Sequence, residues 1–276
     1  MGKARALILE AKEIRKDIIE MIYRAGSGHS GGSLSAVEIL TCLYGAVMNH
    51  NPSNPGAGDR DRFILSKGHA APLLYSVLSR YGYIERDELK TLRQMGSRLQ
   101  GHPNKDMIPG IDLSTGSLGL GISSGLGMAL AGKLMKKDYR VYVLCGDGEL
   151  DEGQNWEAFM SINKWKPDNL MVIIDYNRVQ LDGTAEEVMP MGDLKAKLEA
   201  FGLKVLSCDG NDMEELLEAF DEAQNAREPV VLIARTVKGK GVSFMEGKHI
   251  WHGKMIDDEA YRLAMEEIER GAQDGQ

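Results

Sequence analysis

The sequence predicts an α/β protein in which helices flank both faces of a parallel sheet. Two short apolar runs, residues 141–145 and 170–174, are rich in β-branched side chains and end in turn residues, which is typical of buried parallel strands. Segments of helical periodicity alternate with such runs, and this alternation favours a parallel sheet between two helical layers. We expect a single domain over residues 1–276 that ends in a helical tail.

The amino-terminal part is predicted to be mainly helical. Residues 4–24 carry Leu, Ala and Ile at helical spacing with charged residues between them, which indicates an amphipathic helix. Ser35 and Glu38 resemble a capping box, so a second helix is expected from Ser35 to about Met48. The next expected elements are a strand over 62–65 and helices over 71–81 and 85–95.

Small residues dominate the helix expected over residues 122–136, and close packing against a neighbour would explain them despite their poor helix propensity. The later elements are a helix over 193–201, a strand over 203–207, a helix over 212–226, a strand over 229–235 and a helical tail from Asp257. The long, Gly-rich segment 95–121 has no periodicity. Long loops inside domains are usually functional, so we expect this one to bind a ligand.

The composition indicates a cytoplasmic protein that binds neither nucleic acid nor membranes. The net charge of -8 argues against the basic clusters that nucleic acid requires. No apolar run is long enough to cross a bilayer, and charged residues interrupt the amino terminus where a signal peptide would be apolar. The three cysteines are widely spaced in apolar contexts, which suggests free thiols in a reducing compartment.

Two oxygen-bearing side chains follow predicted strands directly. Asp147 lies in a Gly-Asp-Gly turn after the first strand, and Asn177 follows the next. Ligands of α/β proteins bind at this edge of the sheet, and carboxylate and amide oxygens suit Mg²⁺ or Ca²⁺. A backbone carbonyl from near Val179 would complete a set that leaves room for two phosphate oxygens and a water. A diphosphate fits better than a triphosphate, because the sequence lacks a Walker-type Gly-Lys-Ser motif.

Five of the six histidines lie in or beside Gly-rich turns. They are His29, His69, His102, His249 and His252. Glycine lets the backbone turn tightly, and imidazole can donate to phosphate, carbonyl or hydroxyl oxygens near neutral pH. Any single loop histidine is about as often merely solvated, but five in such turns favour a ligand site.

Taken together, these motifs resemble those of the transketolase family. The Gly-Asp-Gly turn with Asn177 is similar to the thiamine diphosphate signature, and the other motifs follow transketolase order from about residue 8 to 255. They are Ser27-Gly28-His29, Ser66-Lys67-Gly68-His69-Ala70, Gly101-His102-Pro103, Thr115-Gly116-Ser117-Leu118-Gly119, Glu152-Gly153, Leu181-Asp182-Gly183 and His249-Ile250-Trp251-His252-Gly253. The resemblance implies the amino-terminal, diphosphate-binding domain of a transketolase.

The resemblance also implies roles for individual residues. The metal ligands would be Asp147, Asn177 and the Val179 carbonyl, holding Mg²⁺ or Ca²⁺. Thiamine diphosphate would be contacted by His69, the Gly148 amide, His249, Asn177 and the backbone of Gly116, Ser117 and Leu118, and Glu152 would lie at the subunit interface of the cofactor site. The catalytic histidines, which face the sugar and steer proton transfers, would be His29, His102 and His249.

A full transketolase is more than twice as long as this chain, and the resemblance ends where its pyrimidine-binding domain would begin. That domain supplies the glutamate that activates the cofactor. We therefore expect one half of a split transketolase, working with a carboxy-terminal subunit that carries the pyrimidine-binding and C-terminal domains, two copies of each. Its substrates would be a ketose phosphate donor and an aldose acceptor. Pentose phosphates, an apiose-derived sugar and a sulfosugar all remain open.

Three alternatives deserve a test. The chain could be the α subunit of a 2-oxoacid dehydrogenase, which shares the Gly-Asp-Gly turn, or a relative of deoxyxylulose phosphate synthase. It could also be a non-catalytic interaction protein that retains an old cofactor fold. Within the sequence, the turn Lys238-Gly239-Lys240-Gly241 could approach a phosphate, but a solvated turn is about as common.

Overall fold

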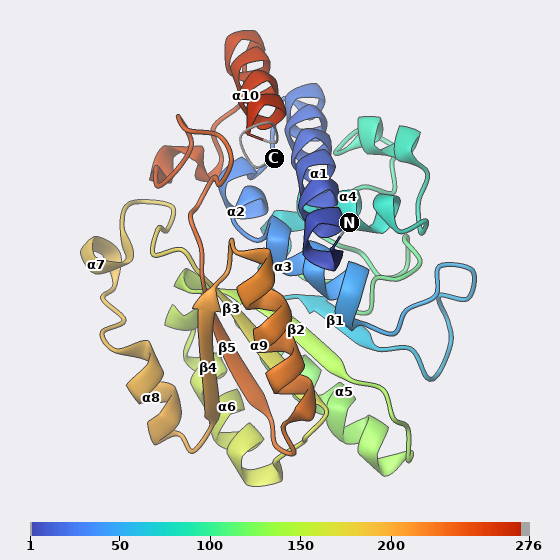
Figure 1. The fold of residues 1–276 in the computed structure, drawn as a ribbon, viewed down its shortest axis with the longest axis vertical. Coiled ribbons are helices and arrows are strands. Elements are labelled where there is room, and N and C mark those ends of the chain that lie inside the picture. The colour runs from blue at the N-terminus through green and yellow to red at the C-terminus, as the bar shows by residue number, and fades with distance from the viewer. Residues whose placement is uncertain (1, 272–276) are drawn as a thin grey trace.

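A computed structural model describes residues 2–271 and shows a five-stranded parallel sheet with the strand order β1-β2-β3-β5-β4 (Figure 1). The strands are β1 (Arg62–Leu65), β2 (Val141–Gly146), β3 (Leu170–Tyr176), β4 (Lys204–Asp209) and β5 (Val230–Arg235). Each lies where the apolar runs predict a strand, with ends that differ by two residues or fewer. All five carboxyl ends meet at one edge, marked by the arrowheads in Figure 1.

Helices account for most of the remaining chain. They are α1 (Lys3–Ala25), α2 (Ser30–Leu34), α3 (Val37–Cys42), α4 (Ala71–Arg80), α5 (Gly121–Leu134), α6 (Gly153–Trp165), α7 (Ala185–Val188), α8 (Leu194–Ala200), α9 (Met213–Asn225) and α10 (Asp258–Arg270). Five single helical turns are η1 (Leu43–Val47), η2 (Gly68–Ala70), η3 (Arg86–Thr91), η4 (Gly148–Asp151) and η5 (His249–His252). No helix within residues 2–271 is both long and apolar enough to span a membrane.

The two faces of the sheet are covered by different helices, as predicted. Tyr142 and Leu144 of β2 pack into a core with α1, α3, α4 and α9. Val141, Val143 and Cys145, which alternate with them, pack into a second core with α5, α6 and α8. Because side chains alternate across a strand, a strand that is apolar throughout must be covered on both sides. In Figure 1, α9 lies in front of the sheet and α6 lies behind it.

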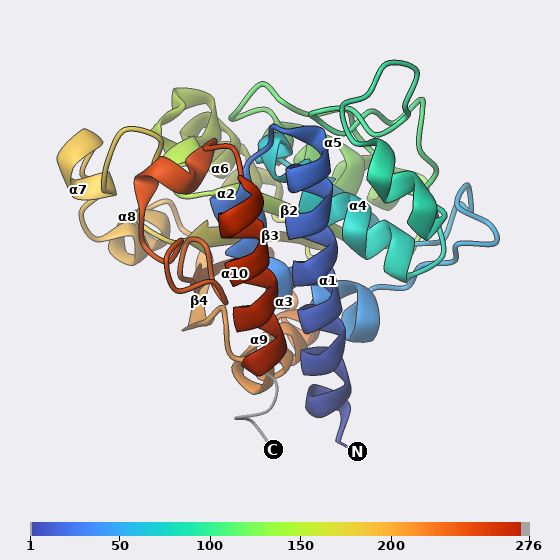
Figure 2. The same cartoon turned by 90° about the horizontal axis from the view of Figure 1, so that it is seen from above.

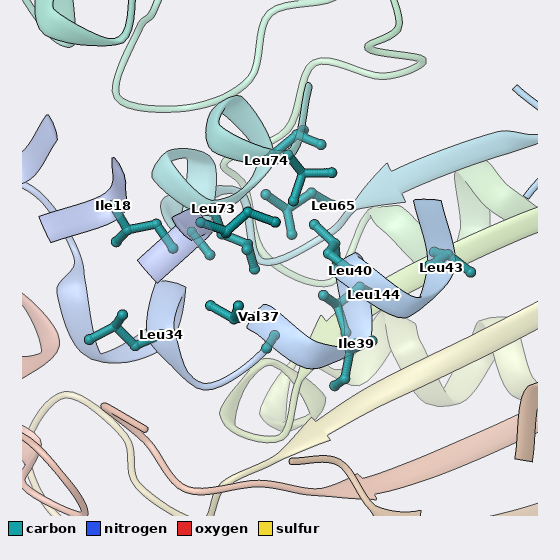
Figure 3. Close-up of a cluster of buried hydrophobic side chains, with 14 of the residues drawn as sticks. Ile18, Leu34, Val37, Ile39, Leu40, Leu43, Leu65, Leu73, Leu74 and Leu144 are labelled. Atoms are coloured by element: carbon teal, nitrogen blue, oxygen red, sulfur yellow. The ribbon is translucent and has the colours of Figure 1, made fainter. Parts of the chain in front are cut away.

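The first core joins the amino-terminal helices to the sheet. Figure 3 shows Leu73 of α4 and Leu65 of β1 beside Leu40 of α3, with Leu144 of β2 below them. All four side chains are buried. This packing fixes α2 and α3 against the carboxyl ends of the strands, where the candidate site lies.

Helices α1 and α10 bring the two ends of the described chain together (Figure 2). The rings of Tyr23 and Tyr261 stack with centroids 4.2 Å apart, and the Tyr23 hydroxyl donates to Asp258 at 2.8 Å. The helical tail expected from Asp257 therefore forms and packs on α1. Residues 272–276 of that predicted tail lie outside the described residues.

The helix expected from Ser35 to about Met48 is confirmed over residues 37–47, where α3 continues without a gap into the π-helical turn η1. A further short helix, α2, precedes it, and Ser35 falls between α2 and α3. The Ser35 hydroxyl does not cap a helix; it donates to Asp175 at 2.6 Å, and the Gly32 carbonyl oxygen lies 3.1 Å from it. A buried carboxylate on a distant strand thus overrides the local capping pattern. The helix expected over 85–95 is limited to the 3₁₀ turn η3.

Candidate functional site

A pocket of about 220 Å³ lies at the carboxyl ends of β1, β2, β3 and β5. Its walls include Lys67, His69, Asp147, Asn177, Val179, Lys238 and His252. Each follows a strand or belongs to a loop held against the strand ends. Parallel strands deliver their carboxyl ends to one edge, and this is why residues far apart in sequence meet here.

Asp147 is fixed at the floor of the pocket. Its side chain is only 5% exposed, and its carboxylate accepts the backbone N–H groups of Gly148, at 2.8 Å, and Arg178. Burial raises its pKa to about 6, with a further increase from the nearby Asp175. A cation beside this buried carboxylate would stabilise its ionised form.

Asp175 lies at the centre of a buried network beneath the pocket. It accepts hydrogen bonds from Ser35, Lys67, Thr236 and the Asn177 amide, the last at 3.1 Å. Burial alone would raise its pKa, but the Lys67 ammonium and the hydroxyl donors hold that pKa below its usual value. The residue is therefore a fixed negative charge that positions the groups around it.

Asn177 and Val179 are joined by a local turn. The Asn177 Oδ1 accepts the backbone N–H of Val179 at 3.1 Å, while its Nδ2 donates to Asp175. The side chain is thereby held in one orientation. Asn177, Val179 and Asp147 all border the same pocket.

The buried lysine Lys238 faces these oxygens. Its Nζ lies 2.7 Å from the Val179 carbonyl oxygen, 3.1 Å from the Gln180 carbonyl oxygen and 3.1 Å from the His252 Nδ1. Burial lowers the pKa of Lys238 to about 8, and the Lys67 charge adds to the effect. Within the turn 238–241, Lys238 and Gly239 are buried, whereas Lys240 and Gly241 are half-buried.

Three histidines form a cluster, of which His69 and His252 border the pocket. The rings of His29, His69 and His252 lie with centroids 5.2–5.3 Å apart in all three pairs. Burial lowers the pKa of His29 to about 4 and that of His252 to about 3, and it holds the pKa of His69 well below the usual value. All three are neutral at pH 7, and the His29 Nδ1 is buried without a hydrogen-bond partner among residues 2–271.

The structure separates the two histidines of η5. His252 borders the pocket, whereas His249 is exposed and lies near Glu187 of α7. Contact of His249 with the diphosphate and the sugar stays a prediction; in the structure it is His252 that lies at the pocket. His102 lies outside the pocket beside Gly116, where a Cβ on that glycine would be 3.1 Å from the His102 Cγ.

The loop 115–119 approaches the pocket closely. A Cβ on Gly68 would lie 2.7 Å from the Thr115 Oγ1 and 2.8 Å from the Gly116 nitrogen, so only glycine allows this contact. Leu118 lines the pocket, while the Ser117 side chain is exposed. The backbone of this loop is therefore held against the turn that carries His69.

Glu149 anchors the same loop from below. Its carboxylate accepts the Gly119 amide at 2.9 Å, the Gly146 amide at 3.1 Å and the Ser66 hydroxyl. Burial raises its pKa. Glu152, in contrast, has an exposed side chain at the start of α6.

Sequence reasoning missed Asp175, Lys67, Glu149 and the position of Lys238. A signal existed for Asp175, since a charged residue inside an apolar strand needs a buried partner. Lys67 stands in the Ser-Lys-Gly-His motif and could have been that partner. Nothing in the sequence indicates that Lys238 is buried, because its Gly-rich surroundings look like a surface turn.

The donor set fits a hard divalent cation. Asp147, Asn177 and Val179, which border the pocket, offer one carboxylate, one amide oxygen and one carbonyl oxygen, and the Lys238 ammonium donates to that carbonyl. Within residues 2–271 no group of three or more His, Cys, Asp or Glu side chains is arranged around a common metal position. Of the three predicted ligands, only Asp147 belongs to those residue types.

Comparison with known proteins gives a family match over nearly the whole chain. The family described as "Transketolase, thiamine diphosphate binding domain" matches residues 8–269. A subunit of an apulose-4-phosphate transketolase from Phocaeicola vulgatus is 44% identical over 267 residues, covering 96% of this chain and 95% of the relative. A 6-deoxy-6-sulfo-D-fructose transketolase subunit from a Clostridium species is 42% identical, with 95% of both chains covered.

Longer relatives match over less than half of their own length. Human transketolase is 40% identical over 267 residues, which cover 96% of this chain but 42% of the human protein. Among solved structures, transketolase from Campylobacter jejuni has a TM-score of 0.90 with 35% identity, covering 95% of this chain and 42% of that one. The sheet and its helices are therefore those of a transketolase.

Proposed function

Because the chain belongs to the transketolase family, as its thiamine diphosphate-binding domain, we propose that it is the amino-terminal subunit of a two-chain transketolase. The enzyme would transfer a two-carbon ketol unit from a ketose phosphate to an aldose acceptor. The observation that carries this proposal is the pocket itself. It is bordered by Asp147, Asn177 and Val179 together with His69, His252 and Lys238, whose ammonium donates to the Val179 carbonyl.

The proposed metal ligands are the Asp147 carboxylate, the Asn177 Oδ1 and the Val179 carbonyl, which would hold Mg²⁺ or Ca²⁺. The diphosphate would be met by His69, the Gly148 amide and, in addition to the expected contacts, Lys238. When bound, thiamine diphosphate supplies the centre that stabilises a carbanion. The part of this chain is to hold the charged end of the cofactor in one orientation.

The proposed sugar-facing histidines are His29, His102 and His252, with His252 in place of His249. The pKa values of His29, at about 4, and His252, at about 3, leave both imidazoles neutral at pH 7. A neutral imidazole has one donor and one acceptor nitrogen, so it can hold a substrate hydroxyl and move a proton. Their neutral state supports a role in proton transfer to and from the substrate, and not a role in binding it through a positive charge.

The remaining expected contacts also remain proposals. The backbone of Gly116, Ser117 and Leu118 would meet the aminopyrimidine edge, since the Gly68 contact holds this loop toward the pocket. Glu152 would lie in the interface with a second subunit, which is compatible with its exposed side chain. We place the protein in the cytoplasm, in keeping with three free, buried cysteines.

The partner is proposed to be a carboxy-terminal subunit with the pyrimidine-binding and C-terminal domains, two copies of each chain. This chain covers 42% of human transketolase, whereas it covers 95% of a relative that is itself named as one subunit of a transketolase. The names of the two subunit relatives make apulose 4-phosphate and 6-deoxy-6-sulfo-D-fructose the first donors to test, beside pentose phosphates.

The test compares the purified chain with the chain assembled with its carboxy-terminal partner, using ketol transfer and pyruvate decarboxylation as parallel assays. We expect transfer only from the assembly. Transfer by this chain alone would contradict the two-chain enzyme, and decarboxylation without transfer would favour the 2-oxoacid dehydrogenase alternative. An assembly that binds no thiamine diphosphate in a calorimetric titration would favour a non-catalytic protein.

A further inference from the structure

We propose that Lys238 is an internal counter-cation, which occupies the Val179 carbonyl in the cofactor-free chain and excludes a divalent cation until a diphosphate binds. Cation and diphosphate would then bind only together. The inference rests on the proposed function, because it assigns Val179 to the metal. It goes beyond the proposed function because it describes how the cofactor-free chain discriminates against a divalent cation.

The ammonium of Lys238 is fully satisfied without any ligand. An ammonium has three N–H donors, and the structure offers three acceptors within reach. They are the Val179 carbonyl at 2.7 Å, the Gln180 carbonyl at 3.1 Å and the His252 Nδ1 at 3.1 Å. A neutral His252 accepts at Nδ1 only with its proton on Nε2, so the contact also selects one tautomer.

The loop around Lys238 fixes the side chain in this position. Lys238 is only 3% exposed. The Gly247 amide donates to its carbonyl at 2.9 Å, and the next residue, Gly239, donates to the Gly31 carbonyl at 3.0 Å. A Cβ on Gly31 would lie 3.2 Å from the Cγ and Cε atoms of Lys238, so the glycine leaves room for the lysine stem. The ammonium is therefore placed by the fold and does not sample solvent.

A divalent cation and this ammonium cannot share the Val179 oxygen at low cost. A metal bound to that carbonyl would lie close to the ammonium, and like charges repel strongly where water is excluded. Two carboxylates, Asp147 and Glu149, and two lysines, Lys67 and Lys238, line the pocket, and the buried Asp175 beneath it supplies a third carboxylate, paired with Lys67. A cation alone would leave positive charge in excess, whereas a diphosphate brings the negative charge that both the cation and the lysine need.

The test measures Mn²⁺ binding to the full chain by calorimetry, with Mn²⁺ standing in for Mg²⁺. Without thiamine diphosphate, Lys238→Met is expected to bind Mn²⁺ about tenfold more tightly than the wild type, a typical strength for coupled sites. Lys238→Arg keeps the charge and is expected to stay close to the wild type. Lys240→Met removes a half-buried lysine of the same loop, which lies outside the pocket and pairs with Glu246 at 3.8 Å, and is expected to change nothing.

Equal Mn²⁺ affinity in Lys238→Met and the wild type would overturn the inference. If Lys238→Met does not fold, the wild type still decides, because it should bind Mn²⁺ at least tenfold more tightly with saturating thiamine diphosphate than without it. Identical affinities with and without the cofactor would overturn the coupling. A wild type that binds neither Mn²⁺ nor thiamine diphosphate, alone or with its partner, would overturn the proposed function itself and this inference with it.

Discussion

Lys67 and Asp175 form a buried ion pair that passes over the end of the intervening strand β2. Lys67 follows β1 and Asp175 lies in β3, and their side chains are 2% and 0% exposed. A Cβ on Gly146, the last residue of β2, would lie 3.8 Å from the Lys67 Cδ, so the lysine stem runs directly above that glycine. The pair links the turn that carries His69 to the strand that presents Asn177.

Replacing Asp175 is expected to destabilise the whole chain. Asp175→Asn leaves the Lys67 ammonium buried without its partner charge, and such a loss typically costs about 3–5 kcal/mol. Urea unfolding followed by circular dichroism measures the change. Arg262→Ala is the control, because its pair with Glu266 is exposed and should contribute little. A change no larger than that of the control would show that the buried pair does not stabilise the fold.

The stability of the cofactor-free chain is expected to fall as the pH drops below about 6.5. His29 and His252 have folded-state pKa values of about 4 and about 3, so the unfolded chain binds their protons first as the pH falls. Asp147, with its pKa raised to about 6, opposes this because the folded state takes up its proton first. Urea midpoints at pH 7 and pH 5 test the balance. The double variant with His29→Asn and His252→Asn should lose less stability than the wild type, and an equal loss would contradict the assignment.

Removing one proposed metal ligand should abolish stabilisation by the cofactor. A ligand at 100-fold its Kd stabilises the state it binds by about 2.7 kcal/mol, which raises the melting temperature. Asp147→Asn weakens the metal site, so Mg²⁺ with thiamine diphosphate should leave its melting temperature nearly unchanged. Asp182→Asn, an exposed residue after the pocket-lining Leu181, should keep the full shift. A full shift in Asp147→Asn would exclude that carboxylate as a ligand.

The two histidines of η5 should differ in their effect on catalysis. In the enzyme assembled with its partner, His252→Ala is expected to lower kcat/KM by about 10²–10⁴, as for loss of a proton-transfer group. His249→Ala should lower it by less than about threefold, because its side chain is exposed outside the pocket. Steady-state kinetics of ketol transfer separates the two. The reverse order would restore the role that the sequence motif implied for His249.

Adding one methyl group at Gly68 should disturb the loop that faces the pocket. In Gly68→Ala the new Cβ would lie within 2.9 Å of both Thr115 and Gly116, and such overpacking costs about 1–3 kcal/mol. Gly127→Ala is the matched control, since no atom lies within 4 Å of a Cβ there and a helical alanine is favoured. Thermal melts with and without thiamine diphosphate test both. Equal behaviour of the two variants would show that the close approach is not needed.

The sequence predicts the parts of the site that depend on strand direction. Asp147 and Asn177 follow apolar runs, and the parallel polarity of the strands is enough to bring them to one edge. The role of Ser35 could not be predicted, because its hydroxyl bonds to Asp175, a residue on a distant strand, and does not cap the helix that follows. Short-range patterns do not contain that contact.

Two other features of the site have a similar origin. Which of His249 and His252 borders the pocket depends on how η5 packs against α2, which composition and spacing leave undecided. Lys238 stands in a Gly-rich turn that looks solvated, and it becomes buried only when the loop closes over α2. In both cases the deciding contacts come from segments that meet only in the folded chain.

The network around Asp175 also has a consequence for the order of events in folding. It draws donors from Ser35, Lys67, Asn177 and Thr236, which are spread along most of the chain. Closing such distant segments onto one carboxylate requires β1, β3 and β5 to be aligned first, since loop closure must precede the contacts it permits. The pocket therefore cannot form before these strands are aligned. A chain emerging from the ribosome would gain its diphosphate anchor only after β5 had been synthesised, so the cofactor cannot serve as a template for the sheet.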